Sequence, residues 1–176
     1  MPRRGRNSLL NQKVFFVTTT VDGWKSVFRE RVRQQALLNT IVSLIANYDA
    51  RLYGYVIMPS HFHLLIRVEG GGPMLSQVMK DIKSISSREV LKLAGESWMA
   101  RFDDVAIYSE SQFSTKLNYI HNNPVKAGLV SKPEDYGYSS ARAWLNGVDE
   151  GCVCTALFER TDRCTDSFSR RVPNRT

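Results

Sequence analysis

Two kinds of hydrophobic pattern alternate along the chain. Short runs rich in β-branched and aromatic residues are typical of strands, and longer segments with apolar residues at helical spacing are typical of helices. The predicted strands are residues 13–21, 51–58, 61–69 and 101–109, and the predicted helices are residues 29–48, residues 74–93 and a third that begins at Ser109 or Ser111 and is limited by Pro124. This order of elements predicts an α+β domain with a central antiparallel sheet flanked by helices.

Turn residues mark the ends of these elements. Asp22-Gly23 closes the first strand, and Pro59-Ser60 separates the second strand from the third, so these two strands most simply form a hairpin. The run Gly-Gly-Gly-Pro at 70–73 lacks the lysine of a phosphate-binding loop and predicts a turn from strand to helix. Residues 130–140 predict a loop that packs through its tyrosines.

The chain has 176 residues, which suits one domain with a substantial core. The hydrophobic pattern fades after Leu145, so we expect a domain over residues 1–149 and a loosely ordered basic tail over residues 150–176. The tail holds all the cysteines of the chain, Cys152, Cys154 and Cys164. Their odd number argues against a disulfide framework, and no histidine lies near them to complete a four-ligand zinc site, so free thiols are the simplest interpretation.

The charge of the chain bears on its partners. Lysine and arginine number 24 against 17 acidic residues, which gives a formal net charge of +7 and favours nucleic acid or an anionic membrane surface as partner. No apolar stretch approaches the roughly 18 residues of a membrane span, and the basic N-terminus lacks the apolar core of a secretory signal. We therefore expect a soluble, cytoplasmic protein.

Two of the three histidines, His61 and His63, flank Phe62 in the predicted strand "HFHLLIRVE". Side chains alternate between the faces of a strand, so both imidazoles lie on one face and Phe62 lies on the other. A pair of neutral imidazoles on one face can share a divalent metal ion. Two partly buried histidines bonded to backbone or water would fit the same pattern, and the residues alone leave both interpretations open.

The third histidine lies in "LNYIHNNPVKAGLV", residues 117–130. On a helix Tyr119 and Asn123, four residues apart, share a face, whereas His121 points elsewhere. An oxygen of Asn123 could complete a metal site with the histidine pair, and Tyr119 would then lie beside the metal as a nucleophile for a polarised phosphate. Taken alone, however, this segment favours a simpler interpretation: a core tyrosine followed by a helix stop at Asn123-Pro124.

Together, "MPSHFHLLI" and "YIHNNPVKAGLV", with Tyr119 lying 56 residues after His63, resemble the REP-associated tyrosine transposases. These are single-tyrosine members of the HUH nuclease superfamily (His-hydrophobic-His), whose ferredoxin-like fold has a central antiparallel sheet flanked by helices. The resemblance runs from about residue 14 to about residue 144. The segments "RFDDVAIYSE" before the tyrosine helix and "YGYSSARAW" after it match as well.

The resemblance implies roles for four residues. His61 and His63 would be metal ligands, Tyr119 the nucleophile, and Asn123 a third ligand where the wider superfamily often has a longer polar residue such as Gln. The metal would be Mg²⁺ or Mn²⁺, and the substrate single-stranded DNA beside a short hairpin. Cleavage would leave a 5′-phosphotyrosine and a free 3′-hydroxyl, and rejoining would need no ATP because the phosphoester energy is retained.

Basic and aromatic residues supply candidate DNA contacts. The basic candidates, which could neutralise phosphates, are Arg3, Arg4, Arg6, Lys13, Lys80 and Lys83. The aromatic candidates, which could stack unpaired bases, are Phe15, Phe16, Trp24 and Trp98. Core packing is the simpler interpretation for most of the aromatic residues, whereas so basic an N-terminal segment cannot belong to a core.

Two other classes of protein are compatible with parts of the sequence. A non-catalytic hairpin-binding protein could retain the HUH framework without needing Tyr119, and a structural zinc protein could use the histidines with the tail cysteines. The presence of Tyr119 in its motif favours the enzyme, and the long gap to the cysteines disfavours the zinc protein. The resemblance leaves a monomer or a homodimer open, and of these we expect the monomer.

Overall fold

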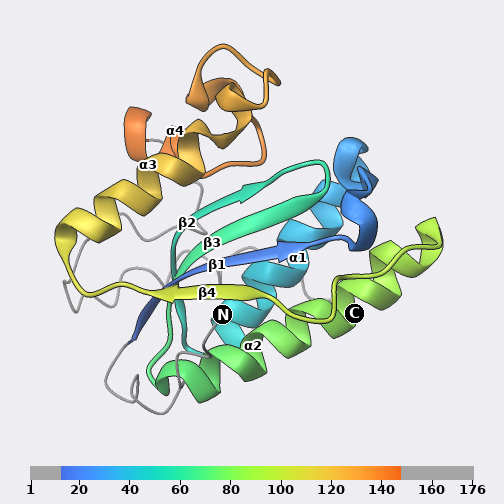
Figure 1. Ribbon diagram of the computed structural model, residues 1–176, viewed down its shortest axis with the longest axis horizontal. Helices are drawn as coiled ribbons and strands as arrows, with labels where there is room; N and C mark the ends of the chain where they lie inside the picture. The colour runs from blue at the N-terminus through green and yellow to red at the C-terminus, as the bar shows by residue number, and fades with distance from the viewer. Residues whose placement is uncertain (1–12, 148–176) are drawn as a thin grey trace, which may run out of the picture.

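The computed structural model describes residues 13–147 and contains one four-stranded sheet. The strands run in the order β2-β3-β1-β4, and every neighbouring pair is antiparallel (Figure 1). The strands are β1 (Val14–Thr20), β2 (Arg51–Ile57), β3 (His61–Arg67) and β4 (Asp103–Ala106). The helices are α1 (Arg31–Asn47), α2 (Gly71–Ser86), α3 (Glu110–Lys126) and α4 (Ala141–Asn146). The predicted α+β architecture is confirmed.

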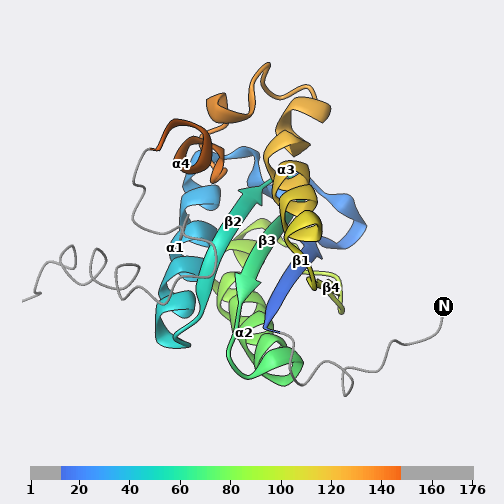
Figure 2. The same ribbon diagram turned by 90° about the vertical axis from the view of Figure 1, so that its left-hand side faces the viewer.

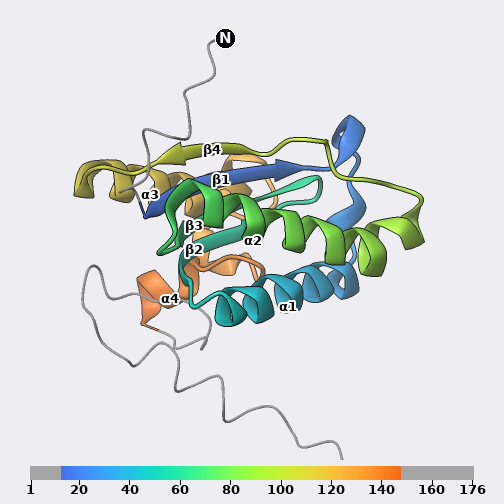
Figure 3. The ribbon, with the colours of Figure 1, turned by 90° about the horizontal axis from the view of Figure 1, so that it is seen from below.

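Helices cover both faces of the sheet. In Figure 3, α1 and α2 run across one face, and in Figure 1, α3 and α4 lie on the other. Side chains of β1 and β3 alternate accordingly: Phe15 and Phe62 join the core beneath α1 and α2, whereas Phe16 and Leu65 join the core beneath α3. Because both faces are buried, the central strands contain continuous apolar runs, at residues 14–17 in β1 and 64–66 in β3.

The predicted hairpin is present. β2 and β3 pair over most of their length and lie side by side in Figure 2, and the Met58 amide donates to the His61 carbonyl at 2.8 Å across the turn. The pairing register shifts between Leu52 and Gly54, which makes a bulge in β2. The bulge and the glycine that follows it lie where β2 passes beneath α3.

Several boundaries differ from the predictions. The helix predicted from residue 74 begins at Gly71, because Gly71 turns the chain with φ +63° and Pro73 is tolerated in a first helical turn. α2 is followed by a π turn (Ser87–Leu91) and a 3₁₀ turn (Lys92–Ala94). The strand predicted over residues 101–109 is only four residues long, since Ser109 already caps the next helix.

α3 begins as predicted, and the Ser109 hydroxyl accepts a hydrogen bond from the Gln112 amide at 3.2 Å. The helix continues past Pro124 to Lys126, so the interpretation of Asn123-Pro124 as a helix stop is wrong. A proline removes one amide donor and the helix runs on for less than a turn, after which Gly128 adopts φ +69°.

The loop after α3 covers the edge of β2 that no other strand of the sheet pairs with. The Tyr136 hydroxyl donates to the Ile57 carbonyl at 2.8 Å, the Ile57 amide donates to the Tyr138 carbonyl at 2.9 Å, and Val56 forms an isolated bridge with Ser139. The loop therefore packs through its tyrosines, as predicted, and protects the edge strand. It contains a 3₁₀ turn at Pro133–Asp135 and leads into α4, a helix that the sequence patterns did not predict.

Within the part of the chain that the structure describes, no helix is both long and apolar enough to cross a membrane. The predicted boundary at residue 149, the tail and its cysteines lie outside the described residues.

Candidate active site

The histidine pair lies on the face of the sheet that α3 covers. The ring centroids of His61 and His63 are 4.9 Å apart with planes at 74°, and Phe62 points to the opposite face, where it contacts Trp98. His63 is 3% exposed and His61 is partly buried. The same-face arrangement predicted from the strand period is confirmed.

A hydroxyl group holds one nitrogen of each imidazole. Thr18 Oγ1 lies 2.8 Å from His63 Nδ1, and Ser60 Oγ lies 3.1 Å from His61 Nδ1. This leaves Nε2 as the second nitrogen of each ring, which these hydroxyls do not hold. His63 Nε2 is buried and has no hydrogen-bond partner among the described residues. A buried nitrogen without a partner is costly, and a metal ion would satisfy it.

The surroundings keep both imidazoles neutral. Burial, followed by repulsion from His61 and Lys116, lowers the pKa of His63 from 6.5 to about 3. Burial also lowers the pKa of His61. Neutral imidazole is the form that ligates metals, so the pair needs no deprotonation step near neutral pH.

The site has no third acidic, histidine or cysteine ligand within the described residues, where no group of three such side chains gathers. Asn123 is partly buried and lies one helical turn after Tyr119 on α3. Its amide oxygen is therefore the side-chain donor that the sequence motif offers for a third position. Its role as a ligand stays a prediction.

Tyr119 combines contact with the histidines and access to solvent. Its ring centroid lies 5.3 Å from that of His63 and 5.7 Å from that of Phe16, both in edge-to-face geometry. The residue is nevertheless 41% exposed. The interpretation of Tyr119 as a core tyrosine is therefore wrong: its ring closes the histidine site from one side while the residue stays accessible to a substrate.

Two lysines that the sequence analysis missed flank this tyrosine. Lys116 Nζ lies 4.6 Å from the ring centroid of Phe16 and 5.8 Å from that of Tyr119, and Lys126 Nζ lies 5.6 Å from the Tyr119 centroid. Both occur at helical spacings from Tyr119, three residues before and seven after, which was the available signal. They add positive charge beside the Tyr119 ring.

His121 points away from the site, as predicted, and has a structural role. Its Nε2 lies 2.9 Å from Ser140 Oγ, and that hydroxyl also bonds to the backbone of Tyr55 in β2. Burial lowers the pKa of His121 to about 4, so the ring is neutral. His121 and Ser140 thus tie α3 to the sheet on which His63 lies.

The predicted phosphate contacts do not converge on the histidines. Lys80 and Lys83 belong to α2, which lies against the opposite face of the sheet (Figure 3). Lys83 Nζ donates to the carbonyls of Met99 and Ala100 at 2.6 and 3.1 Å, so its main contacts are within the protein.

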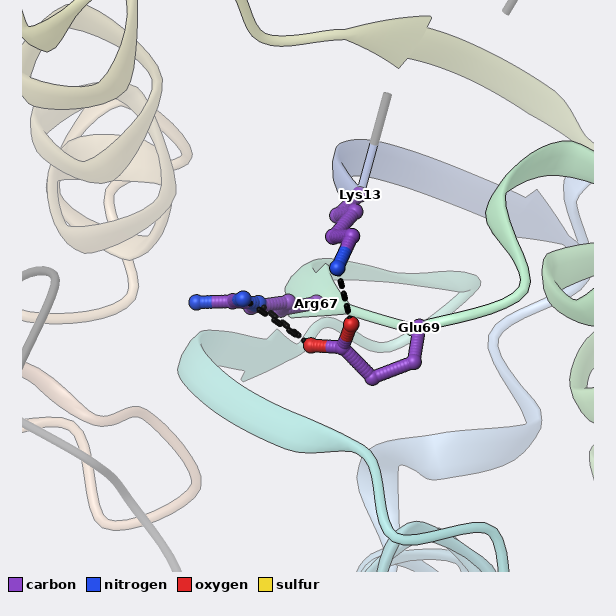
Figure 4. Close-up of polar contacts among 3 residues, drawn as sticks. All are labelled: Lys13, Arg67 and Glu69. Carbon is purple, nitrogen blue, oxygen red and sulfur yellow. Dashed lines mark hydrogen bonds and ion pairs between the residues drawn. The ribbon is translucent and has the colours of Figure 1, made fainter. Parts of the chain in front are cut away.

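Lys13 forms an ion pair with Glu69, which also binds the Arg67 guanidinium (Figure 4). Val14 pairs with Arg67 and Thr20 pairs with His61, so this cluster lies at the far end of β3 from His61. Contact between Lys13 and DNA stays a prediction, and Arg3, Arg4 and Arg6 lie outside the described residues.

Comparisons with known proteins agree with this arrangement. The model of a family described as "Transposase IS200 like" matches residues 10–123. A REP-associated tyrosine transposase of Escherichia coli (strain K12) is 25% identical over 108 residues, which cover 60% of this chain and 63% of the relative, less than two thirds of its length. A putative REP-associated tyrosine transposase of Haemophilus influenzae is 23% identical over 138 residues, covering 72% of this chain and 77% of that protein.

A solved structure of a REP-associated tyrosine transposase bound to a REP hairpin has the same fold. It superposes with a TM-score of 0.70 at 20% identity, covering 92% of this chain and 93% of the other.

Proposed function

The chain belongs to the IS200-like transposase family, and from its site we propose that it cleaves and rejoins single-stranded DNA beside a hairpin, with Tyr119 as the nucleophile. The observation that carries the proposal is the contact of an accessible tyrosine with a buried histidine whose Nε2 has no hydrogen-bond partner among the described residues. The hairpin-bound relative with the same fold supports a hairpin as the recognised DNA structure.

The donor set fits a divalent metal ion. His61 and His63 would hold it through Nε2, with Asn123 as a third donor, and we propose Mg²⁺ or Mn²⁺. When bound, the ion would offset negative charge on the scissile phosphate. Imidazole nitrogen is a better ligand for Mn²⁺ than for Mg²⁺, so the site should bind Mn²⁺ more tightly than Mg²⁺.

The residues of the chain perform the rest of the chemistry. The Tyr119 oxygen attacks phosphorus, a bond from phosphorus to this oxygen forms, and the bond to the 3′ oxygen breaks. The phenolic proton leaves to solvent, to which Tyr119 is open, and the departing oxygen takes a proton from solvent and becomes a 3′-hydroxyl. Lys116 and Lys126 bind the flanking phosphates and hold the strand against the tyrosine. Attack by a 3′-hydroxyl on the phosphotyrosine reverses the step and rejoins DNA.

A covalent-adduct assay tests the proposal. The protein is mixed with labelled single-stranded DNA containing the hairpins that flank its gene, with Mn²⁺ or with EDTA, and resolved on denaturing gels. We expect a metal-dependent band of protein linked to DNA, which Tyr119→Phe abolishes. Tyr108→Phe is the matched control, because Tyr108 is a 62% exposed tyrosine just before α3.

The outcomes separate the two candidate classes of protein. DNA that is retarded on native gels but never linked, equally with wild type and Tyr119→Phe, would support the non-catalytic hairpin-binding alternative. An adduct that forms equally in EDTA would contradict the role of the histidine pair.

Sedimentation of the protein with and without hairpin DNA would test the expected monomer.

A further inference from the structure

An exposed tryptophan lies beside the histidine pair. Trp24 is 60% exposed, and its ring centroid lies 5.6 Å from that of His61 with planes at 68°. The other three aromatic residues that the sequence offered for base stacking, Phe15, Phe16 and Trp98, are at most 8% exposed and belong to the core. Trp24 alone among these four can present a ring face to a ligand.

The backbone at Trp24 is strained. Its φ is +58°, and besides Trp24 only Asp49 among the described non-glycine residues has a positive φ. Asp adopts this region fairly often because its short side chain bonds locally, but a bulky aromatic residue rarely does. A conformation of this kind persists where the surrounding structure imposes it, and such positions cluster at functional sites.

The surroundings of this turn hold it in place. The Trp24 amide donates to the Val21 carbonyl at 3.0 Å, and the Asp22 amide donates to the Ser97 carbonyl at 2.8 Å. The Val21 amide donates to the Ser60 carbonyl at 2.8 Å, which joins the turn to the hairpin that carries His61. Trp24 is therefore attached to the same rigid elements as the histidines.

We propose that Trp24 is a stacking platform for an unpaired nucleobase of the DNA strand that enters the site. The inference rests on the proposed function only in taking single-stranded DNA as the substrate. Every base has a π-face, so an accessible aromatic ring on a fixed support binds bases with little regard to sequence. Because the Trp24 ring contacts His61, the stacked base belongs to a nucleotide adjoining the scissile phosphate. The platform would hold that nucleotide in register with Tyr119.

Binding to an oligothymidylate of ~12 nucleotides tests this role, since single-strand site sizes are of that order. The wild-type protein in EDTA is titrated with this probe and with an abasic strand of equal length, so that cleavage plays no part. We expect Trp24→Ala to weaken oligothymidylate binding by roughly 5- to 150-fold and to leave abasic binding unchanged. Trp24→Phe keeps an aromatic ring, so it should lose less affinity for oligothymidylate than Trp24→Ala does. Tyr108→Ala, which removes another exposed ring, should bind as the wild type does.

Tryptophan fluorescence supplies a readout that a merely structural role would not change. Oligothymidylate should quench the emission of the wild type, and Trp24→Phe should remove most of the quenching while Trp98 and Trp144 remain. Equal affinities of wild type and Trp24→Ala for both strands, or quenching that persists in Trp24→Phe, would overturn the proposal.

This experiment does not depend on catalysis. Base-dependent quenching in a protein that never forms an adduct would support the platform while contradicting the proposed nuclease. Covalent adducts in a protein whose DNA binding does not depend on Trp24 would support the proposed nuclease and contradict the stacking platform.

Discussion

Gly54 controls how closely α3 approaches the sheet, and Gly54→Ala should therefore disturb both the fold and the site. A Cβ at this position would lie 2.7 Å from Leu117 Cδ1 and 3.5 Å from Ser140 Oγ. Leu117 lies two residues before Tyr119 on α3, and it is 7% exposed within the core beneath that helix. A movement of α3 that relieves the contact would also move the tyrosine.

The magnitude follows from the contact distance. Carbon atoms pack at about 3.5–4.0 Å, so Leu117 or the helix must move by roughly 1 Å. Overpacking of this kind typically costs about 1–3 kcal/mol. Replacing glycine also restricts the unfolded chain, which stabilises the protein by about 0.4–1 kcal/mol. The net loss in the free energy of unfolding should be about 0–2.6 kcal/mol.

Urea denaturation of Gly54→Ala and Gly137→Ala measures this loss. Gly137 is the matched control, because an added Cβ would meet nothing within 4 Å there and its φ is not positive. Gly137→Ala therefore measures only the stabilisation that comes from restricting the unfolded chain. We also expect Gly54→Ala to slow adduct formation, because Tyr119 would no longer lie as closely against His63.

A double mutant identifies the cause. In a Leu117→Ala background the clashing atom is absent, so adding Gly54→Ala should cost little or be stabilising. If Gly54→Ala were as stable and as active as Gly137→Ala, or if its cost were unchanged in the Leu117→Ala background, the reasoning would be refuted.

Three further predictions concern single side chains. Thr18→Val removes the hydroxyl that holds His63 Nδ1, and calorimetry should show Mn²⁺ affinity reduced roughly 10- to 100-fold; an unchanged affinity would contradict the orienting role. Lys116→Gln should reduce the slope of log affinity against log salt for single-stranded DNA by roughly 0.7. Lys80→Gln, on the other face of the sheet, should leave that slope unchanged. Equal slopes for the two variants would argue against a phosphate contact at Lys116. Between pH 6.5 and about 4 only the unfolded chain protonates His121, so the free energy of unfolding should fall as the pH falls through this window, by up to about 3 kcal/mol. Urea titrations across this range should show a weaker pH dependence in His121→Gln than in wild type, and identical pH dependences would exclude the buried neutral histidine.

The sequence by itself determined the local features of this protein. The period of two in residues 61–69 predicted that His61 and His63 share a face, and the structure confirms it. The two serines at 109 and 111 predicted the start of α3, which Ser109 caps, and Pro59-Ser60 marked the hairpin. These features depend on backbone geometry and on neighbours a few residues away, which is the information that residue patterns carry.

Tertiary structure decided which of these local features meet. Tyr119 lies 56 residues from His63 in sequence, and nothing in its own segment distinguished a core tyrosine from an exposed one beside a histidine. The same holds for Lys83, because the sequence did not reveal that its ammonium donates to the Met99 and Ala100 carbonyls on the opposite side of the sheet from the histidines. The sequence offered Trp24 as one of four aromatic candidates for base stacking, and only its exposure and its contact with His61 distinguished it from the other three. Such contacts depend on strand register and on how closely a helix docks, and packing of side chains from distant segments sets both.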